Sequence, residues 1–141
     1  MYKNILLTVD LEHPKAQVKS VPVAVELCQQ HDAKLHIMTV VPSFGMSIVA
    51  QQFPKDFEKK VSKAALAQLK DFVKEKFPAD IKAQHIVGHG NIYESILDVS
   101  KQINADLIIV QARRPELRKF LLGPNAARVV RHATCSVLVV R

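Results

Sequence analysis

The sequence predicts a single α/β domain: a doubly wound, five-stranded parallel sheet with helices on both faces. Short runs rich in Ile, Leu and Val alternate along the whole chain with segments of helical periodicity. Alternation of this kind produces parallel strands joined by right-handed crossovers. The 141 residues, 48% apolar and 23% charged, suit one domain over 1–141 with a core of ordinary size.

Five apolar runs predict the strands. They cover residues 3–9, 34–41, 82–88, 106–111 and 136–141. Most of them are near-continuous Val, Ile and Leu, as in strands that are buried on both faces. The third run, KAQHIVG, is more polar and suits an edge of the sheet. A flavodoxin-like arrangement gives the strand order 3-2-1-4-5 and places the topological switch point between the first and fourth strands.

Four segments with helical spacing separate these runs. They cover residues 15–31, 56–77, 92–103 and 125–132, with a loop at 43–54. The apolar stripe of the first helix consists of Val18, Val21, Val25 and Cys28. Pro22 falls inside this pattern, so we expect the helix to begin late or to kink there.

The starts of the last two helices carry local signals. Asn91 and Glu94 form a start that resembles a capping box. Gly123-Pro124-Asn125 opens the last helix, and proline is favourable at a first helical position.

The net charge of +7 favours anionic partners. The Lys and Arg residues are spread along the chain, with one local concentration at Arg113, Arg114, Arg118 and Lys119. The sequence shows no recognition-helix pattern and no aromatic stacking platform, so nucleic acid is not an expected partner. No apolar run approaches the ~20 residues that cross a bilayer, and MYKNILLTVD does not read as a signal peptide. The expected location is the cytoplasm.

Motifs for catalysis and metal binding are missing from the sequence. Cys28 and Cys135 lie among apolar residues and form no CxxC pair, which predicts buried, reduced thiols. His85 and His89 could form a metal pair, but no third ligand is spaced for it, so no metal site is predicted. There is no nucleophile elbow, HExxH motif or P-loop, and no serine has an identifiable base. The chain is expected to bind rather than to catalyse, with slow ATP hydrolysis left open.

Ligands of such sheets bind outside the carboxyl ends of the strands, at the switch point. The residues that arrive there are Val9 and Asp10, Val40 and Val41, and Gln111, from the first, second and fourth strands. The last helix adds its N-terminus at 123–126, where free N–H groups favour an anion. Together with the arginines this predicts a nucleotide pocket. Asp10 could instead only cap the loop that follows it, and the arginines could be a solvated basic loop.

Four stretches resemble the universal stress protein family: ILLTVD, GNIYESI, ADLIIV and the ending LLGPNAARVVRHATCSVLVVR. The resemblance runs from end to end, and its C-terminal third resembles the enterobacterial F- and G-type branch. It implies the fold given above and a homodimer formed by antiparallel pairing of the last strand, 136–141. It also implies ATP, with or without magnesium, held by a G-x2-G-x9-G-(S/T) loop, by an Asp after the first strand and by the end of the second strand.

On the adenosine side the resemblance carries over directly. Asp10 matches the acidic position, and Val40 and Val41 match the strand end beside adenine.

On the phosphate side the match is partial. Gly123 matches the last glycine, whereas Gln111 stands for the first, and Arg114 or its neighbour Arg113 for the second. The spacing to Gly123 is one residue short, as in the F and G branch. Pro124 replaces the Ser or Thr, which removes a hydroxyl and a backbone N–H.

The N–H groups of Asn125 and Ala126 remain available for phosphate. Two functions follow: a nucleotide-binding stress-response module, or a dimeric interaction protein whose degenerate loop no longer binds ATP.

Overall fold

The computed structural model describes residues 1–41, 57–112 and 123–141. Its elements are β1 (Asn4–Thr8), a 3-10 turn (Pro14–Gln17), α1 (Ser20–His31), β2 (Lys34–Val41), α2 (Phe57–Lys76), β3 (Ala83–His89), α3 (Ile92–Gln102), β4 (Leu107–Gln111), α4 (Pro124–His132) and β5 (Ser136–Val140). Every predicted strand is present within one residue of its expected ends. The predicted loop at 43–54 lies outside the described residues.

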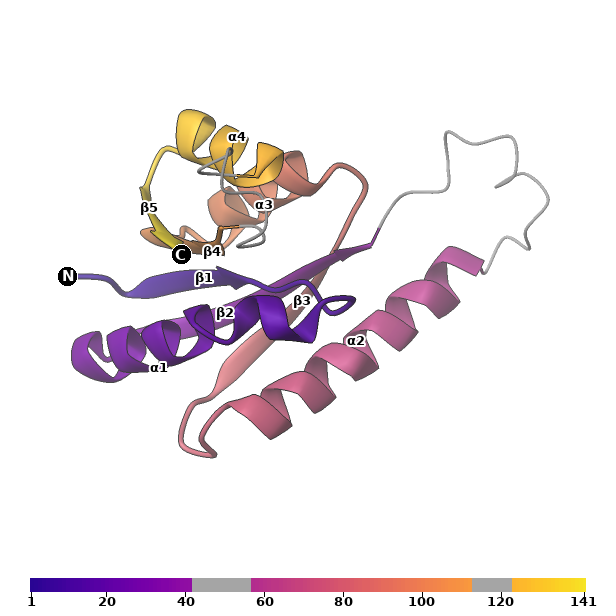
Figure 1. The fold of residues 1–141 in the computed structure, drawn as a ribbon, viewed down its shortest axis with the longest axis horizontal. Coiled ribbons are helices and arrows are strands. Elements are labelled where there is room, and N and C mark those ends of the chain that lie inside the picture. The colour runs from indigo at the N-terminus through magenta and orange to yellow at the C-terminus, as the bar shows by residue number, and fades with distance from the viewer. Residues whose placement is uncertain (42–56, 113–122) are drawn as a thin grey trace.

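The five strands form one parallel sheet in the order β3-β2-β1-β4-β5, which confirms the predicted topology. The central strand β1 pairs with both neighbours, so that Leu6 lies between His36 of β2 and Ile108 of β4. Helices α1 and α2 cover one face, and α3 and α4 cover the other (Figure 1). The polar strand β3 lies at one edge, as expected, and β5 lies at the other.

Two apolar cores lie on either side of the sheet because successive strand residues point to opposite faces. Ile5 and Leu7 pack against α1 and α2, whereas Leu6 between them packs against α3 and α4. All three side chains are fully buried. The central strands therefore read as continuous apolar runs, and their carboxyl ends are held firmly at one edge of the domain.

The first helix begins late, as Pro22 predicted. α1 starts at Ser20, which places Pro22 in the first turn, where its missing N–H leaves no hydrogen bond unmade. The expected burial of Val18 is wrong: 66% of this residue is exposed. Val18 lies before α1, at the end of the 3-10 turn, and so does not share the orientation of the buried Val21 and Cys28.

Both cysteines are free thiols, as the sequence predicts. Cys28 is buried, and desolvation raises its pKa to about 11. Cys135 is half-buried rather than buried, and its pKa is raised by burial first and by the Asp106 charge second. Both groups are therefore neutral thiols at neutral pH.

His36 is a buried polar side chain on the sheet face that also holds Met38. Its Nδ1 atom lies 2.6 Å from Oε1 of Gln84, and its buried Nε2 atom has no partner among the described residues. A buried nitrogen without a partner costs about 1–3 kcal/mol.

Replacing His36 by leucine should therefore raise the free energy of unfolding by about 1 kcal/mol, measured by urea denaturation. Gln84→Leu is the matched control: it removes the partner of Nδ1 but keeps the imidazole, so it should lower stability. A less stable His36→Leu protein would show that Nε2 is satisfied in solution.

Candidate functional site

A cavity of about 560 Å³ opens at the carboxyl edge of the sheet. It lies at the predicted switch point, where β1 and β4 are adjacent strands. The chain that follows β1 leads to a helix on one face of the sheet, and the chain that follows β4 leads to a helix on the other. Strand ends, the start of α3 and the start of α4 form its wall. The lining residues are Thr8, Val9, Asp10, Glu12, Ala16, Gln17, Met38, Thr39, Val40, Gly90, Asn91, Ile92, Ile96, Val110, Gln111, Ala112, Gly123, Pro124, Asn125 and Ala126.

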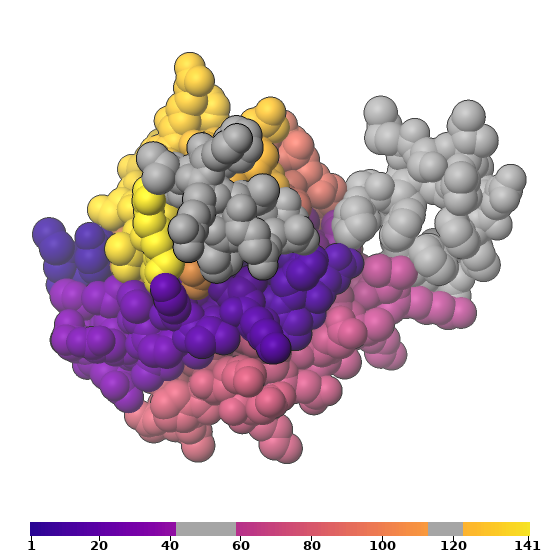
Figure 2. Space-filling model, viewed as in Figure 1, coloured from indigo at the N-terminus to yellow at the C-terminus, as the bar shows by residue number. Residues whose placement is uncertain are grey.

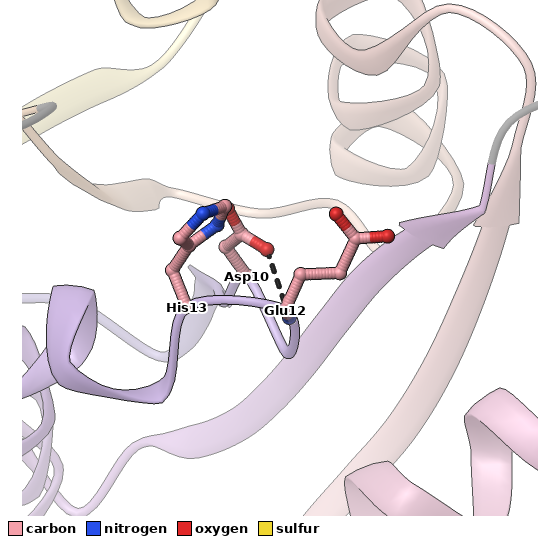
Figure 3. A group of neighbouring side chains, drawn as sticks. All are labelled: Asp10, Glu12 and His13. Atoms are coloured by element: carbon pink, nitrogen blue, oxygen red, sulfur yellow. Dashed lines mark hydrogen bonds and ion pairs between the residues drawn. The ribbon is translucent and has the colours of Figure 1, made fainter.

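Asp10 follows β1 and stands at the mouth of this cavity. Its Oδ1 atom accepts a hydrogen bond from the backbone N–H of Glu12 at 3.1 Å (Figure 3). Its Oδ2 atom lies 3.0 Å from Nδ1 of His13. The carboxylate therefore caps its own loop, the simpler of the two predicted roles, and it is only half-buried beside the cavity.

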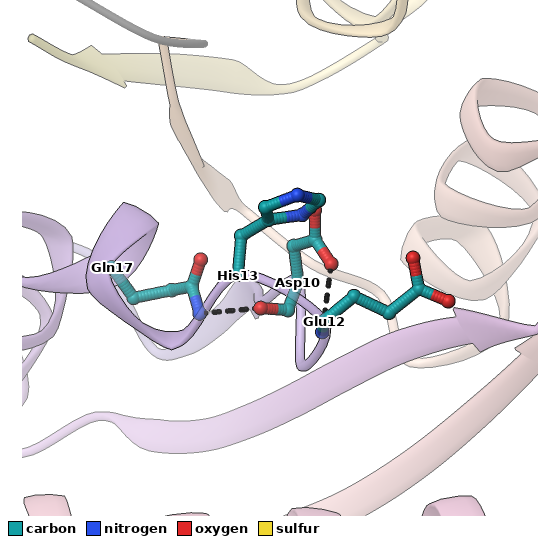
Figure 4. Close-up of polar contacts among 4 residues, drawn as sticks. All are labelled: Asp10, Glu12, His13 and Gln17. Atoms are coloured by element: carbon teal, nitrogen blue, oxygen red, sulfur yellow. Dashed lines mark hydrogen bonds and ion pairs between the residues drawn. The ribbon is translucent and has the colours of Figure 1, made fainter.

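Gln17 also holds the loop that follows β1 in place. This side chain is 2% exposed, and its Nε2 atom donates to the backbone oxygen of Asp10 at 2.9 Å (Figure 4). Gln17 belongs to the 3-10 turn, so a polar side chain from this turn reaches back into the site. Sequence reasoning missed it, since a lone glutamine next to an apolar stripe carries no distinctive signal.

Among the described residues, Asp10, Glu12 and His13 are the one group with three potential metal-ligating side chains close together. One ligand atom from each lies within 4.8 Å of the other two (Figure 3). The set offers two carboxylates and one imidazole, a combination that divalent cations accept. The sequence predicted no metal site and singled out neither Glu12 nor His13.

The histidine pair considered from the sequence does not form a metal site. His85 and His89 both lie on β3, four positions apart, which corresponds to about 13 Å along an extended strand. Desolvation and then the Lys70 charge lower the pKa of His85.

His89 instead meets a serine for which the sequence identified no base: its Nε2 atom lies 3.2 Å from Oγ of Ser62. Within the part of the chain that the structure describes, no carboxylate bonds the other nitrogen of His89, so the arrangement lacks the third group of a catalytic triad.

Gln111, at the end of β4, is held by two hydrogen bonds that span the chain. Its Oε1 atom accepts from the backbone N–H of Ser20, the first residue of α1, at 3.1 Å. Its Nε2 atom donates to the backbone oxygen of Val140, the last residue of β5, at 2.9 Å. The sequence placed Gln111 in the wall correctly but could not show that its amide is already engaged within the protein.

The start of α4 forms the far wall of the cavity. Gly123 is the buried N-cap, and Pro124 occupies the first helical position, as the sequence predicted. The first helical hydrogen bond runs from Ala127 N–H to Gly123 O at 3.0 Å. The N–H groups of Asn125 and Ala126 come before that bond and have no partner within the helix. They are therefore the groups that can donate hydrogen bonds to an anion.

The second strand contributes less than expected. Val40 lines the cavity, whereas Val41 is not part of its lining; the Val41 carbonyl accepts from Gly90 N–H at 3.0 Å. Gly90 has φ 86, a left-handed conformation that favours glycine, and it turns the chain into α3. Asn91 then accepts from Glu94 N–H, which is one half of the predicted capping box.

The stretch from Gly90 to Ile92 therefore forms a wall that sequence reasoning missed. These residues could have been predicted, because they follow the carboxyl end of β3 and the carboxyl ends of all parallel strands lie at the same edge of the sheet. The predicted basic residues Arg113, Arg114, Arg118 and Lys119 lie outside the described residues.

Comparison with known proteins agrees with this architecture. A sequence model of the universal stress protein family matches residues 1–141. The chain belongs to the universal stress protein family. Universal stress protein G of Salmonella typhimurium is 33% identical over 146 aligned residues that span both chains completely. This match confirms the predicted F- and G-type branch.

Solved universal stress proteins share the fold. A universal stress protein crystallised in complex with cAMP is 22% identical, with a TM-score of 0.66 over 99% of this chain and 97% of the other. The Archaeoglobus fulgidus universal stress protein in complex with dAMP is 17% identical, with a TM-score of 0.67 over 99% and 98%. Within the described residues of the present protein, no helix is both long and apolar enough to span a membrane.

Proposed function

We propose that this universal stress protein binds an adenine nucleotide in the cavity at the switch point and acts as a small regulatory module of the stress response. The cavity itself carries the proposal: about 560 Å³ is within the usual range of roughly 300–1,000 Å³ for small-molecule sites. Val9, Val40 and Val110 offer an apolar slot for a base. The cAMP and dAMP complexes of two proteins with this fold support an adenine ligand.

The polar groups of the wall support one orientation of the proposed ligand. Asp10 is the acceptor for ribose or adenine hydrogens, because its carboxylate remains half-exposed at the mouth. The N–H groups of Asn125 and Ala126 are the donors for phosphate. ATP, with or without magnesium, is the specific ligand that we propose.

A second function is favoured by two of the same residues. Both ends of the Gln111 amide are engaged in hydrogen bonds inside the protein, and Pro124 brings no N–H to the phosphate end. A pocket so equipped could be empty in the working protein, which would then act as an interaction module. In either case we propose a cytoplasmic homodimer that pairs through residues 136–141, because β5 is an open edge of the sheet.

Thermal unfolding with and without millimolar Mg-ATP or AMP separates the two functions. A nucleotide present at about 100 times its Kd should add about 2.7 kcal/mol to the free energy of unfolding and raise Tm accordingly. Asp10→Asn, which removes the charge but keeps the shape, should reduce that shift. No shift with either nucleotide would favour the interaction module.

Restoring the serine, Pro124→Ser, should tighten ATP binding about 10-fold or more, since a hydrogen bond to a charged group contributes about 1.5–3 kcal/mol. Isothermal titration calorimetry measures the Kd. Pro124→Ala is the matched control: it restores the N–H without the hydroxyl and therefore reports the backbone share of the gain. An unchanged Kd in both variants would show that the proline does not limit phosphate binding.

A further inference from the structure

The last residue of β5 is attached to the cavity wall at a single backbone oxygen. The carbonyl of Val140 accepts two hydrogen bonds, from Nε2 of Gln111 at 2.9 Å and from the backbone N–H of Ala112 at 2.7 Å. Both donors belong to residues that line the cavity. The carboxyl end of the edge strand β5 is therefore hydrogen-bonded directly to the wall of the cavity.

The side-chain amide of Gln111 can bond both of its backbone partners in only one orientation. The backbone N–H of Ser20 requires an acceptor, and the carbonyl of Val140 requires a donor. Only Oε1 toward Ser20 and Nε2 toward Val140 meets both requirements. The side chain thus fixes the distance between the start of α1 and the end of β5 across the cavity wall.

We infer that Gln111 is a positioning residue that couples occupancy of the cavity to the order of the β5 edge; this inference rests on the proposed nucleotide function. A nucleotide packed against Gln111 and Ala112 restrains the two donors that hold Val140. By thermodynamic linkage, a ligand that favours the ordered edge is itself bound more tightly when the edge is ordered. The strand at which a second copy would pair thereby responds to the ligand.

Backbone groups of successive residues in β5 point alternately toward β4 and toward the open edge of the sheet, so the position of Val140 affects that edge. Val140 directs its carbonyl inward to β4, so the backbone groups of Val139 and Arg141 face the open side. These outward groups lie directly beside the residue that Gln111 holds. Loosening Val140 therefore disturbs the part of β5 that a partner strand would contact.

Two substitutions separate the two bonds of Gln111. Gln111→Glu keeps an oxygen for Ser20 N–H but presents an oxygen, not a donor, to the carbonyl of Val140. Gln111→Leu removes both bonds at similar size. Hydrogen exchange of backbone amides reports each attachment separately in the ligand-free protein; it is read for 138–141 and for 20–23, where Pro22 has no amide hydrogen.

In the ligand-free protein, Gln111→Glu should speed exchange at 138–141 about two- to tenfold, as expected for one ordinary hydrogen bond, and leave 20–23 unchanged. Gln111→Leu should speed exchange in both segments. Faster exchange spread over the whole sheet, or none at 138–141, would overturn the coupling role, and this arm needs no ligand.

The second arm adds AMP at a concentration that calorimetry shows to be saturating for each protein. AMP should slow exchange at 138–141 at least twofold in the wild-type protein, and this protection should be lost in Gln111→Glu. Protection that persists in Gln111→Glu would overturn the inference while leaving nucleotide binding intact. A wild-type protein that binds no AMP or ATP in calorimetry overturns the proposed function, and the ligand-dependent part of the coupling with it.

Discussion

Replacement of Gly88 by valine is expected to lower the free energy of unfolding by about 2–3 kcal/mol. Gly88 is buried on β3 and faces Ser95 of α3. A Cβ atom at this position would overlap Oγ of Ser95 and approach Cε of Met38 to 2.7 Å. The two further methyl groups of valine add to this overlap in a core that has no room for them.

Urea denaturation measures the effect, and two variants test its cause. His89→Val places the same side chain at the next, exposed position and should change stability by less than about 0.5 kcal/mol. Ser95→Ala removes the overlapping oxygen, so Gly88→Ala should be less harmful in that background than alone. Equal costs in both backgrounds would show that the helix moves as a whole rather than that the serine obstructs.

The open edge of β5 leads to the second large effect. Val139→Pro should weaken the proposed homodimer about 10- to 100-fold, because each protomer would lose an outward-facing N–H from the antiparallel pairing. Figure 2 shows atoms of this C-terminal segment, in yellow, at the molecular surface. The inward hydrogen bonds at Val140 do not use the Val139 N–H, so the domain itself should keep its fold.

Sedimentation equilibrium over a range of protein concentrations measures this change in Kd. Val139→Thr is the matched control, since it retains the β-branched shape and the N–H and should remain dimeric. Circular dichroism of both variants establishes that the fold is kept. A wild-type protein that sediments as a monomer at about 100 μM would rule out the dimer altogether.

The sequence predicted what depends on local pattern. Apolar runs placed the strands, because buried parallel strands need apolar residues on both faces, and Pro124 marked the start of α4 because its ring fits a first helical position. Val18 was misplaced because the helical spacing of apolar residues includes it, whereas the α-helical backbone begins only at Ser20. Periodicity alone cannot distinguish a 3-10 turn from the first turn of an α-helix.

What the sequence could not predict is the pairing of distant groups. The two hydrogen bonds of Gln111 connect residues 91 and 29 positions away, and the orphaned nitrogen of His36 depends on which strands lie beside β2. Gln17 is similar, because its contact with Asp10 exists only once the 3-10 turn has formed. The location of the cavity followed from topology, whereas the state of the side chains in its wall required coordinates.

The cavity takes its wall from residues as early as Thr8 and as late as Ala126. A ribosome adds these residues in order, so a growing chain lacks one side of the cavity until α4 has emerged. Strand β5, which pairs with β4 and contains Val140, follows later still. Capture of a small molecule would thus be a property of the folded domain, and no earlier segment of the growing chain would have it.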